Sequence, residues 1–442
     1  MPNPILPSWE YIPDGEPRVF GDRVYLYGSH DRAYADDFCD HKLKVWSAPL
    51  NDLNNWTCHG HSFHTQADRD HESDTPHTDS FLYAPDVIEK DGKYYLYAYI
   101  LGSQGAIGVS DRPEGPFRFL STYKYAPEDA GDEGIYNDAG ILVDDDGKVY
   151  VYYGFEHSHM NQLDPDTMVD VIPGSLIEPV VNDSMEIPEE IRFYEASSPR
   201  KVGDTYYLIY SPRRGSRLAY ATSDSPTGPF TYRGYIIDNG VDYPAGNNHG
   251  SIACINGQWY VFYHRMTNAS ITSRRACVEK ITFAPDGSIP PVEMTSLGFE
   301  DALNPYRETP AEYACVLKGG CFVTEKDLFT RVVTNIGDRN VIGYKYFDFG
   351  EDHSSKTYEL ALKTLGCGMR CRLRILADDY ENGEEIGTVM VGPGDGITRA
   401  TVKALTGRHS IFLIPEITTE GWMKDFFRDR KLFELCSFVF LK

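Results

Sequence analysis

The sequence predicts an all-β protein, a five-bladed β-propeller followed by a β-sandwich of jelly-roll type. Two observations carry this prediction: a tyrosine-rich hairpin recurs five times in the first 300 residues, and the chain then continues as alternating strands without that hairpin. A chain of 442 residues exceeds one ordinary core, and 39 Gly and 27 Pro fit many short strands joined by turns. We therefore expect two domains, at residues 1–300 and 307–442.

The repeated element is a Gly-containing tight turn followed by a strand rich in tyrosine. Its copies are FGDRVYLYGSH (20–30), KDGKYYLYAYI (90–100), DDGKVYVYYGF (145–155), VGDTYYLIYSP (202–212) and INGQWYVFYHR (255–265). The marker tyrosines Tyr25, Tyr95, Tyr150, Tyr207 and Tyr260 are 70, 55, 57 and 53 residues apart. Five all-β units of this length predict five propeller blades, with a sandwich containing coincidental hairpins as the alternative. We assign the longer first interval to the polar stretch 59–80, expected as a loop over the channel mouth.

In a propeller, the strand before each of these turns is the innermost of its blade, and one end of it meets the mouth of the channel. Counting back eleven or twelve residues from four markers gives Asp14, Asp138, Glu195 and His249. In the second unit, Tyr83 lies twelve residues back and Asp86 nine. Carboxylates gathered in a cleft raise one another's pKa, which yields the protonated acid and ionised base that glycoside hydrolysis needs.

This convergence leaves several readings open. Carboxylates on different blades favour the wide separation of an inverting glycosidase over the narrow one of a retaining enzyme. A non-catalytic sugar-binding propeller is the alternative of another class, and a retaining fructosidase-type propeller is a third. A lone inner-strand aspartate more often caps a turn, which is the more common role for Asp86.

Five ordered segments add a family resemblance. They are NPILPSWEYIPDGEPRVFGDRVYLYGSHD (3–31), YNDAGILVDDDG (136–147), FYEASSPRKVGDTYYLIYS (193–211), AGNNHGSI (245–252) and TSRRACVEKI (272–281). Together, over roughly residues 3–295, they resemble glycoside hydrolase family 43, whose five-bladed propellers cut arabinose and xylose from plant polysaccharides. In one departure, Gly15 follows Asp14 where the family usually has proline.

The resemblance implies roles for individual residues. It makes Asp14 the general base, Glu195 the general acid and Asp138 the group that modulates the pKa of the acid. It also implies that His249 helps to hold a hydrated calcium ion in the channel, and that Arg274, with Arg275 as its rival, contacts the sugar.

Three further residues are candidates for substrate contact from their positions alone. They are His30, at the end of the first hairpin, Tyr83, which could offer an apolar face to a sugar, and Asp86. For each of them a purely structural role is the competing interpretation.

The C-terminal region reads as strands at 344–350, 357–365, 371–378, 387–392, 409–415 and 436–442. RVVTNIGDRNVIGYKYFDFG (331–350) with ELCSFVFLK (434–442) resembles carbohydrate-binding modules of family 6. Those modules usually stack sugars on exposed aromatic residues, and Trp422 is the only tryptophan of this region. A domain that packs on the propeller and shapes the rim of its pocket is an equal expectation.

Charge and composition narrow the partners. The formal charge of −24 disfavours nucleic acid and anionic membranes, and suits a neutral substrate. No apolar run of about 18 residues is present, the start has no signal-peptide pattern, and the nine scattered cysteines are expected to be free thiols. We expect a cytoplasmic protein, although a trimmed leader would look the same; the oligomeric state stays open.

The sequence thus predicts an inverting exo-glycosidase that releases a terminal pentose from oligosaccharides. The first choice is an α-L-arabinofuranosidase acting on arabinoxylan or arabinan oligosaccharides. A β-xylosidase or a dual enzyme is the alternative.

Overall fold

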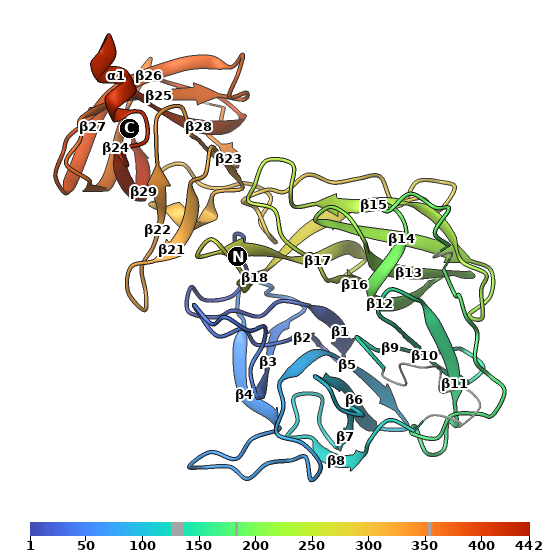
Figure 1. The fold of residues 1–442 in the computed structure, drawn as a ribbon. Coiled ribbons are helices and arrows are strands. Elements are labelled where there is room, and N and C mark those ends of the chain that lie inside the picture. Colours follow the sequence, from blue (N-terminus) through green and yellow to red (C-terminus); the bar gives the residue numbers. More distant parts are fainter. Residues whose placement is uncertain (125–135, 182–183, 352–354) are drawn as a thin grey trace.

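A computed structural model describes residues 1–124, 136–181, 184–351 and 355–442. It is almost entirely β: five small antiparallel sheets surround a common axis, and two larger sheets follow in the C-terminal part (Figure 1). The helical elements of the described chain are a 3-10 turn, η1 (Ala311–Tyr313), and one short helix, α1 (Trp422–Phe427). The predicted fold class is confirmed.

The blades are antiparallel sheets whose strands follow chain order. The first contains β1 (Glu16–Phe20), β2 (Arg23–Tyr27), β3 (Lys42–Pro49) and β4 (Thr57–His64). The second contains β5 (Leu82–Lys90), β6 (Lys93–Ile100), β7 (Ala106–Ser110) and β8 (Arg118–Ser121). The third contains β9 (Gly140–Val143), β10 (Val149–Tyr153) and β11 (His159–Leu163). The fourth contains β12 (Phe193–Val202), β13 (Thr205–Pro212), β14 (Arg217–Ser223) and β15 (Thr231–Asp238), and the fifth β16 (Ser251–Ile255), β17 (Gln258–Thr267) and β18 (Ser270–Ile281).

The first strand of each sheet is the innermost strand of its blade. Strand β1 contacts β5 and β16, and β9 contacts β5 and β12. The hydroxyl of Ser198 in β12 donates to that of Ser251 in β16 at 2.6 Å, which completes the ring. Each marker tyrosine lies on the second strand, directly after an innermost strand, as the repeat predicted.

The aromatic residues of the repeat fill the spaces between blades. Tyr25 and Tyr27 pack with Val87 of the second blade, and Tyr150 packs with Leu208 of the fourth. Alternate side chains of a strand face opposite sides, so each hairpin supplies both interfaces of its blade. Large, rigid rings bury much apolar surface there, which explains why tyrosine recurs at this position.

The expectation for residues 59–80 was wrong in its first part, because residues up to His64 belong to strand β4. This strand is the outermost of its blade, and Thr57, Cys58 and His61 are exposed. An outer strand that faces solvent tolerates polar residues, so no apolar alternation marks it in the sequence. Between β4 and β5, the described residues after His64 form no strand.

The C-terminal part is a sandwich of two antiparallel sheets (Figure 1). One sheet contains β21 (Phe322–Glu325), β22 (Arg331–Ile336), β29 (Phe433–Leu441), β24 (Thr357–Gly366) and β27 (Gly396–Lys403), with β19 (Thr309–Pro310) paired to β29. The other contains β20 (Val316–Lys318), β23 (Val341–Asp348), β28 (Arg408–Ile417), β25 (Cys371–Ala377) and β26 (Glu384–Val391). The sequence missed five strands, β19, β20, β21, β22 and β27. Trp422 lies on α1, at the end of the sandwich remote from the propeller (Figure 1).

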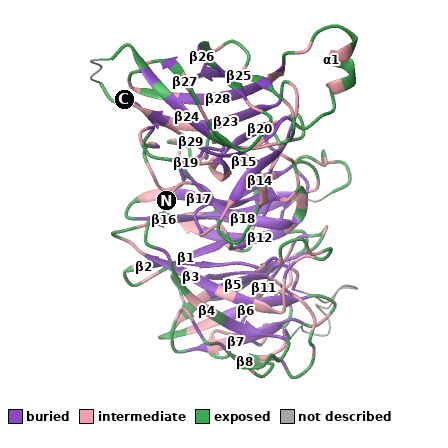
Figure 2. Cartoon of the chain, turned by 90° about the vertical axis from the view of Figure 1, so that its left-hand side faces the viewer, coloured by how far each residue is buried: buried purple, intermediate pink, exposed green. Residues whose placement is uncertain are grey.

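The two parts share a continuous apolar core. One cluster of buried residues includes Tyr243 and Val261 of the propeller, Leu297 of the connecting segment and Leu317 of the sandwich. Figure 2 shows buried residues continuing from the propeller strands into those of the sandwich. The connecting segment 288–306 therefore contributes buried residues to this shared core. The exact domain boundaries stay a prediction.

Two smaller expectations concern thiols and membranes. All nine cysteines are free, as predicted. Within the described ranges, no helix combines the length and apolarity needed to cross a membrane.

Candidate active site

The residues picked by counting back from the marker tyrosines meet at one end of the propeller axis. His249 Nδ1 lies 3.8 Å from Asp14 Oδ1 and 3.8 Å from Asp138 Oδ2. Burial, and then the charge of Asp14, raise the pKa of Glu195 to about 7. Four segments far apart in the chain, each leading into a different innermost strand, thus converge on one site.

The backbone at these positions is unusual. Asp14 and Asp138 have φ angles of 57° and 48°, and Ala196, next to Glu195, has 69°. Non-glycine residues in this left-handed region cost about 1–3 kcal/mol each and cluster at functional sites. Strand β12 also carries register shifts on both sides of Glu195, and such bulges re-aim side chains.

A close approach of two blades fixes the segment that carries Asp138. A Cβ on Gly140, two residues later, would lie 2.2 Å from the backbone oxygen of Ser197, in the strand that carries Glu195. Only glycine allows the third and fourth blades to come this close. The separation of the Asp138 and Glu195 segments therefore depends on this glycine.

Asp14 is buried and held by several donors. Its Oδ1 accepts from Arg274 Nη1 at 2.8 Å, and its Oδ2 accepts from Ser29 Oγ at 2.6 Å. Burial raises the pKa of Asp14, but Arg274 lowers it, and His249, His264 and Ser29 add to that effect, so that the net shift is downward. Asp14 is therefore ionised at neutral pH, as a general base must be.

Arg274 links two buried carboxylates. Its Nε and Nη2 donate to Asp31 at 2.8 Å each, while Nη1 reaches Asp14. Its guanidinium also lies 4.9 Å from the ring centroid of Phe38. Arg275 faces the other side of the strand, where it pairs with Glu312 of the sandwich. Of the two arginines, the structure brings only Arg274 to the site.

Glu195 and Asp138 form the acidic half of the site. Burial, then Glu195 and Asp14, raise the pKa of Asp138 well above its usual range, and a backbone hydrogen bond from Ala196 opposes this shift. Glu195 is half-buried, so part of the residue stays accessible from outside. Because the pKa values of both carboxyls are raised, this half of the site holds a proton near neutral pH, which provides the acid that complements Asp14.

Two tyrosines lie beside these groups. Tyr83 packs edge-on against Tyr99, with 5.7 Å between their ring centroids. Burial, then Asp138, raise the pKa of Tyr99, with a smaller contribution from Glu195. Burial, then Cys39 and Tyr99, raise the pKa of Tyr83, and the charge of Arg274 opposes this shift. The pair thus lies between the acidic half of the site and Arg274, and substrate contact by Tyr83 stays a prediction.

Two other predicted contacts have different partners. His30 Nδ1 lies 3.6 Å from Asp40 Oδ2, and burial lowers the pKa of this imidazole to about 4. Asp86 accepts two hydrogen bonds from Arg18 at 2.9 and 2.5 Å, and one from the backbone of Ile141 at 2.8 Å. Its carboxylate ties β1, β5 and β9 together near the axis. This corrects the assignment of Asp86 to substrate binding, whereas the role of His30 stays a prediction.

Sequence reasoning missed four residues of the site. They are Ser29, Asp31, Tyr99 and His264. Ser29 and Asp31 follow the first hairpin strand on both sides of His30, so the alternation of a strand would have pointed both of them the same way. Tyr99 and His264 occupy the corresponding ends of the second and fifth hairpins, and only the assembled ring brings them to the axis.

The donor set for a calcium ion at His249 is sparse. Within the ranges that the structure describes, no group of three or more His, Cys, Asp and Glu side chains is arranged to hold a metal directly. Calcium takes six to eight oxygen ligands, and an imidazole supplies none. Burial also lowers the pKa of His249, which leaves its ring neutral. These residues do not form a calcium cage, and any ion there would need water for most of its ligands.

Comparisons with known proteins point to one family. The model of the glycosyl hydrolases family 43 matches residues 1–289. A xylosidase/arabinosidase of Thermoclostridium stercorarium is 39% identical over 481 residues, covering 96% of this chain and 98% of the relative. A family 43 β-xylosidase/α-arabinofuranosidase from a compost microbial metagenome, solved with xylotriose in a calcium-free form, has a TM-score of 0.56 at 28% identity. The match covers 66% of this chain and 97% of the chain in that structure.

A longer structure is similar over both domains. The family 43 arabinoxylan arabinofuranohydrolase of Bacillus subtilis, solved with cellotetraose, has a TM-score of 0.56 at 24% identity. The match covers 100% of this chain and 97% of the chain in that structure, which supports the fold of the whole chain. Together with the family model and the 39% identical relative, these findings show that the chain belongs to family 43 of the glycosyl hydrolases.

Proposed function

We propose that this glycosidase is an inverting exo-enzyme that releases a terminal pentose, with Asp14 as its base and Glu195 as its acid. The observation that carries the proposal is the opposite shift of two carboxyl pKa values in one site. The pKa of Asp14 is lowered, while that of Glu195 is raised to about 7. Pairs of titratable groups whose environments push their pKa values apart mark acid and base.

The proposed reaction is a single displacement. Ionised Asp14 takes a proton from a water molecule as the water oxygen bonds to the anomeric carbon. The bond from that carbon to the leaving oxygen breaks, and Glu195 gives its proton to this oxygen. Arg274 keeps Asp14 ionised. Since the acid and base stand on different blades, the site suits the wider separation of an inverting enzyme.

The substrate class follows from the relatives. The 39% identical relative is named a xylosidase/arabinosidase, and the metagenomic structure is titled a β-xylosidase/α-arabinofuranosidase. We propose α-L-arabinofuranosidase activity on arabinose-containing oligosaccharides first, with β-xylosidase activity as the second candidate. A panel of p-nitrophenyl pentosides tests this choice. Release of p-nitrophenol that is lost in Asp14→Ala and in Glu195→Ala supports the proposal, whereas no turnover on any pentoside would favour a sugar-binding propeller.

Calcium remains part of the proposal in a limited form. A hydrated ion near His249 would receive one direct protein contact and otherwise bind water. Such an ion would add positive charge near Asp14 and Asp138, whose oxygens lie 3.8 Å from the imidazole. No step of the reaction above depends on it.

A further inference from the structure

We propose that Glu325 of the C-terminal sandwich is a positioning residue for Asp14, so that the second domain takes part in organising the catalytic base. The inference rests on the function proposed above, which makes Asp14 the base. It gives the sandwich a role other than binding sugar. Two chains of contacts from the β21–β22 hairpin to Arg274 carry the argument.

The first chain runs through Tyr11, three residues before Asp14. The Tyr11 hydroxyl donates to Glu325 Oε1, and its backbone oxygen accepts from the amide of Asp31 at 2.9 Å. Asp31 in turn holds Arg274 through the Nε and Nη2 contacts of 2.8 Å, and Arg274 reaches Asp14 at 2.8 Å. Tyr11, Asp31, Arg274 and Asp14 are all buried, so water cannot replace a lost partner freely.

The second chain runs through Asn268, in the turn between β17 and β18. Its amide donates to the backbone oxygen of Val323 at 2.7 Å, and its side-chain oxygen accepts from Thr324 Oγ1 at 3.1 Å and from the amide of Glu325 at 3.3 Å. This turn leads into β18, which carries Arg274. The Asn268 side chain also donates to the Tyr11 hydroxyl at 3.4 Å, so the two chains meet at this hydroxyl, which donates to the Glu325 carboxylate.

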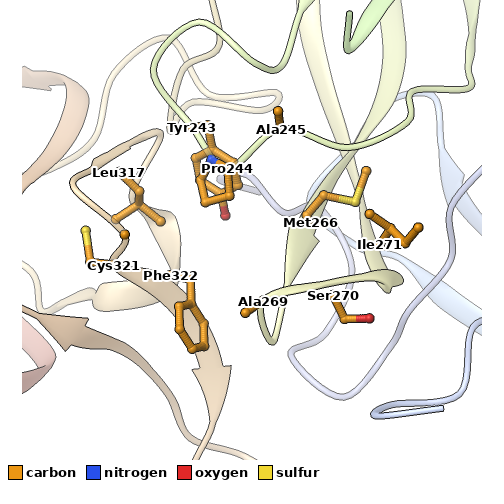
Figure 3. A pocket seen from close by; sticks show the side chains of 11 residues that line it. Tyr243, Pro244, Ala245, Met266, Ala269, Ser270, Ile271, Leu317, Cys321 and Phe322 are labelled. Carbon is orange, nitrogen blue, oxygen red and sulfur yellow. The ribbon is translucent and has the colours of Figure 1, made fainter. Parts of the chain in front are cut away.

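The β17–β18 turn has little other support on that side. A cavity of about 320 Å³ lies between the turn and the sandwich, as Figure 3 shows. Ala269 and Ser270 of the turn line it, opposite Leu317, Cys321 and Phe322 of the sandwich. A turn that borders a void lacks packing partners on one face. Its position therefore depends on the hydrogen bonds between Asn268 and β21.

Small displacements of a base are costly. A misplacement of about 1 Å at a reacting group can reduce the rate about 100-fold, even when the altered residue lies far from the chemistry. Arg274 holds two carboxylates with the directional fork of its guanidinium, so a shift of Asp31 is passed to Asp14. Loss of the Glu325 contact should therefore lower kcat more than it changes KM.

The test uses the full-length enzyme and a matched control. Glu325→Ala removes the acceptor of Tyr11, Tyr11→Phe removes the donor, and Glu325→Gln keeps an acceptor oxygen. The control is Glu434→Ala in β29 of the same sheet, whose carboxylate is held by Lys326 and by Thr334 Oγ1 at 2.7 Å. Steady-state kinetics on p-nitrophenyl α-L-arabinofuranoside or β-D-xylopyranoside, whichever is cleaved, are combined with thermal melting and hydrogen exchange of segments 28–35 and 270–277.

We expect Glu325→Ala and Tyr11→Phe each to lower kcat about tenfold with KM changed less than about twofold. The double variant should lose no more than Glu325→Ala alone, because Glu325→Ala already removes the contact that Tyr11→Phe removes, together with the contact from Arg331 at 3.3 Å. Glu325→Gln should recover most of kcat, and Glu434→Ala should match the wild type. Among the three glutamate variants, only Glu325→Ala should show faster hydrogen exchange in segments 28–35 and 270–277.

Unchanged kcat in both single variants, equal losses in Glu434→Ala, or additive losses in the double variant would overturn the proposal. If Glu325→Ala does not fold, Tyr11→Phe and Glu325→Gln provide the same comparison. A wild-type enzyme that cleaves no pentoside would refute the proposed function instead, and the hydrogen exchange of the two segments would still decide whether Glu325 supports the Asp31 and Arg274 segments.

Discussion

Arg274 donates to Asp14 and to Asp31 at 2.8 Å each, and so joins the proposed base to a buried carboxylate from the end of the first hairpin. The guanidinium keeps Asp14 ionised, while partial burial and the negative charge of Asp14 raise the pKa of Glu195 to about 7. One site therefore contains an ionised and a protonated carboxyl at neutral pH. Single displacement at an anomeric centre requires that asymmetry.

The pH dependence of kcat/KM should show both groups. Activity requires Asp14 ionised and Glu195 protonated. As Glu195 loses its proton, activity should fall when the pH rises through about 7. On the acid side, activity should fall only at low pH, because the pKa of Asp14 is lowered. Initial rates from pH 3 to 10, each checked by thermal melting, measure this profile. Burial also raises the pKa of Glu279 to about 7, far along the chain from the acids, so Glu279→Gln is the control and should leave the basic limb in place. A basic limb above pH 9 would contradict the assignment of Glu195.

Arg274→Ala should be more harmful than Arg274→Lys. Alanine leaves Asp14 and Asp31 buried without their shared cation, which raises the pKa of Asp14 and should shift the acid limb of the profile upward. A lysine restores the charge but cannot reach both carboxylates with a planar fork. We expect kcat/KM to fall about 100-fold or more for alanine, with partial recovery for lysine. Equal activity of both variants and the wild type would refute this role.

Asp86→Ala should destabilise the propeller without changing the chemistry. It leaves the buried Arg18 unpaired, and breaking a buried ion pair costs about 3–5 kcal/mol. Thermal melting should show a marked decrease in Tm, while KM of the folded fraction at low temperature should match the wild type. An unchanged Tm with a raised KM would instead return Asp86 to the substrate site.

Chelation tests the proposed hydrated calcium. If an ion binds through water near His249, prolonged EDTA treatment should remove about one equivalent of calcium by elemental analysis. Because the described residues form no ligand cage for such an ion, the Tm should change by no more than a few degrees on its removal. His249→Ala should lower the calcium content in the same measurement. A purified enzyme that holds no calcium even after dialysis against millimolar calcium would remove the ion from the account.

The blades and most of the site could be predicted because each depends on local sequence. A Gly-containing turn and an alternating aromatic strand are visible within eleven residues, and five copies fix the blade order. Asp14, Asp138, Glu195 and His249 stand eleven or twelve residues before the marker tyrosines, so they could be found by counting. The resemblance favoured Arg274 and left Arg275 as its rival, and the structure brings Arg274 to Asp14 and Arg275 to Glu312.

What could not be predicted depends on contacts between distant segments. Asp31 belongs to the site because it binds Arg274, which lies more than 200 residues away in the chain. Asp86 is structural because Arg18 of another blade donates to its carboxylate. Strand β4 was missed because an exposed outer strand needs no apolar alternation. The contact between Glu325 and Tyr11 has no local signature at all, since it depends on how the sandwich docks on the propeller. Sugar binding by the sandwich itself stays a prediction.

The most direct test of the central claim is the configuration of the first product. Cleavage of the preferred pentoside should be followed by proton NMR within the first turnovers, before mutarotation, with Asp14→Ala and Glu195→Ala in parallel. The account predicts that the sugar appears first as the anomer opposite to that of the substrate, and that both variants lose about 100-fold or more in rate. A product of retained configuration, or an active Asp14→Ala enzyme, would contradict it.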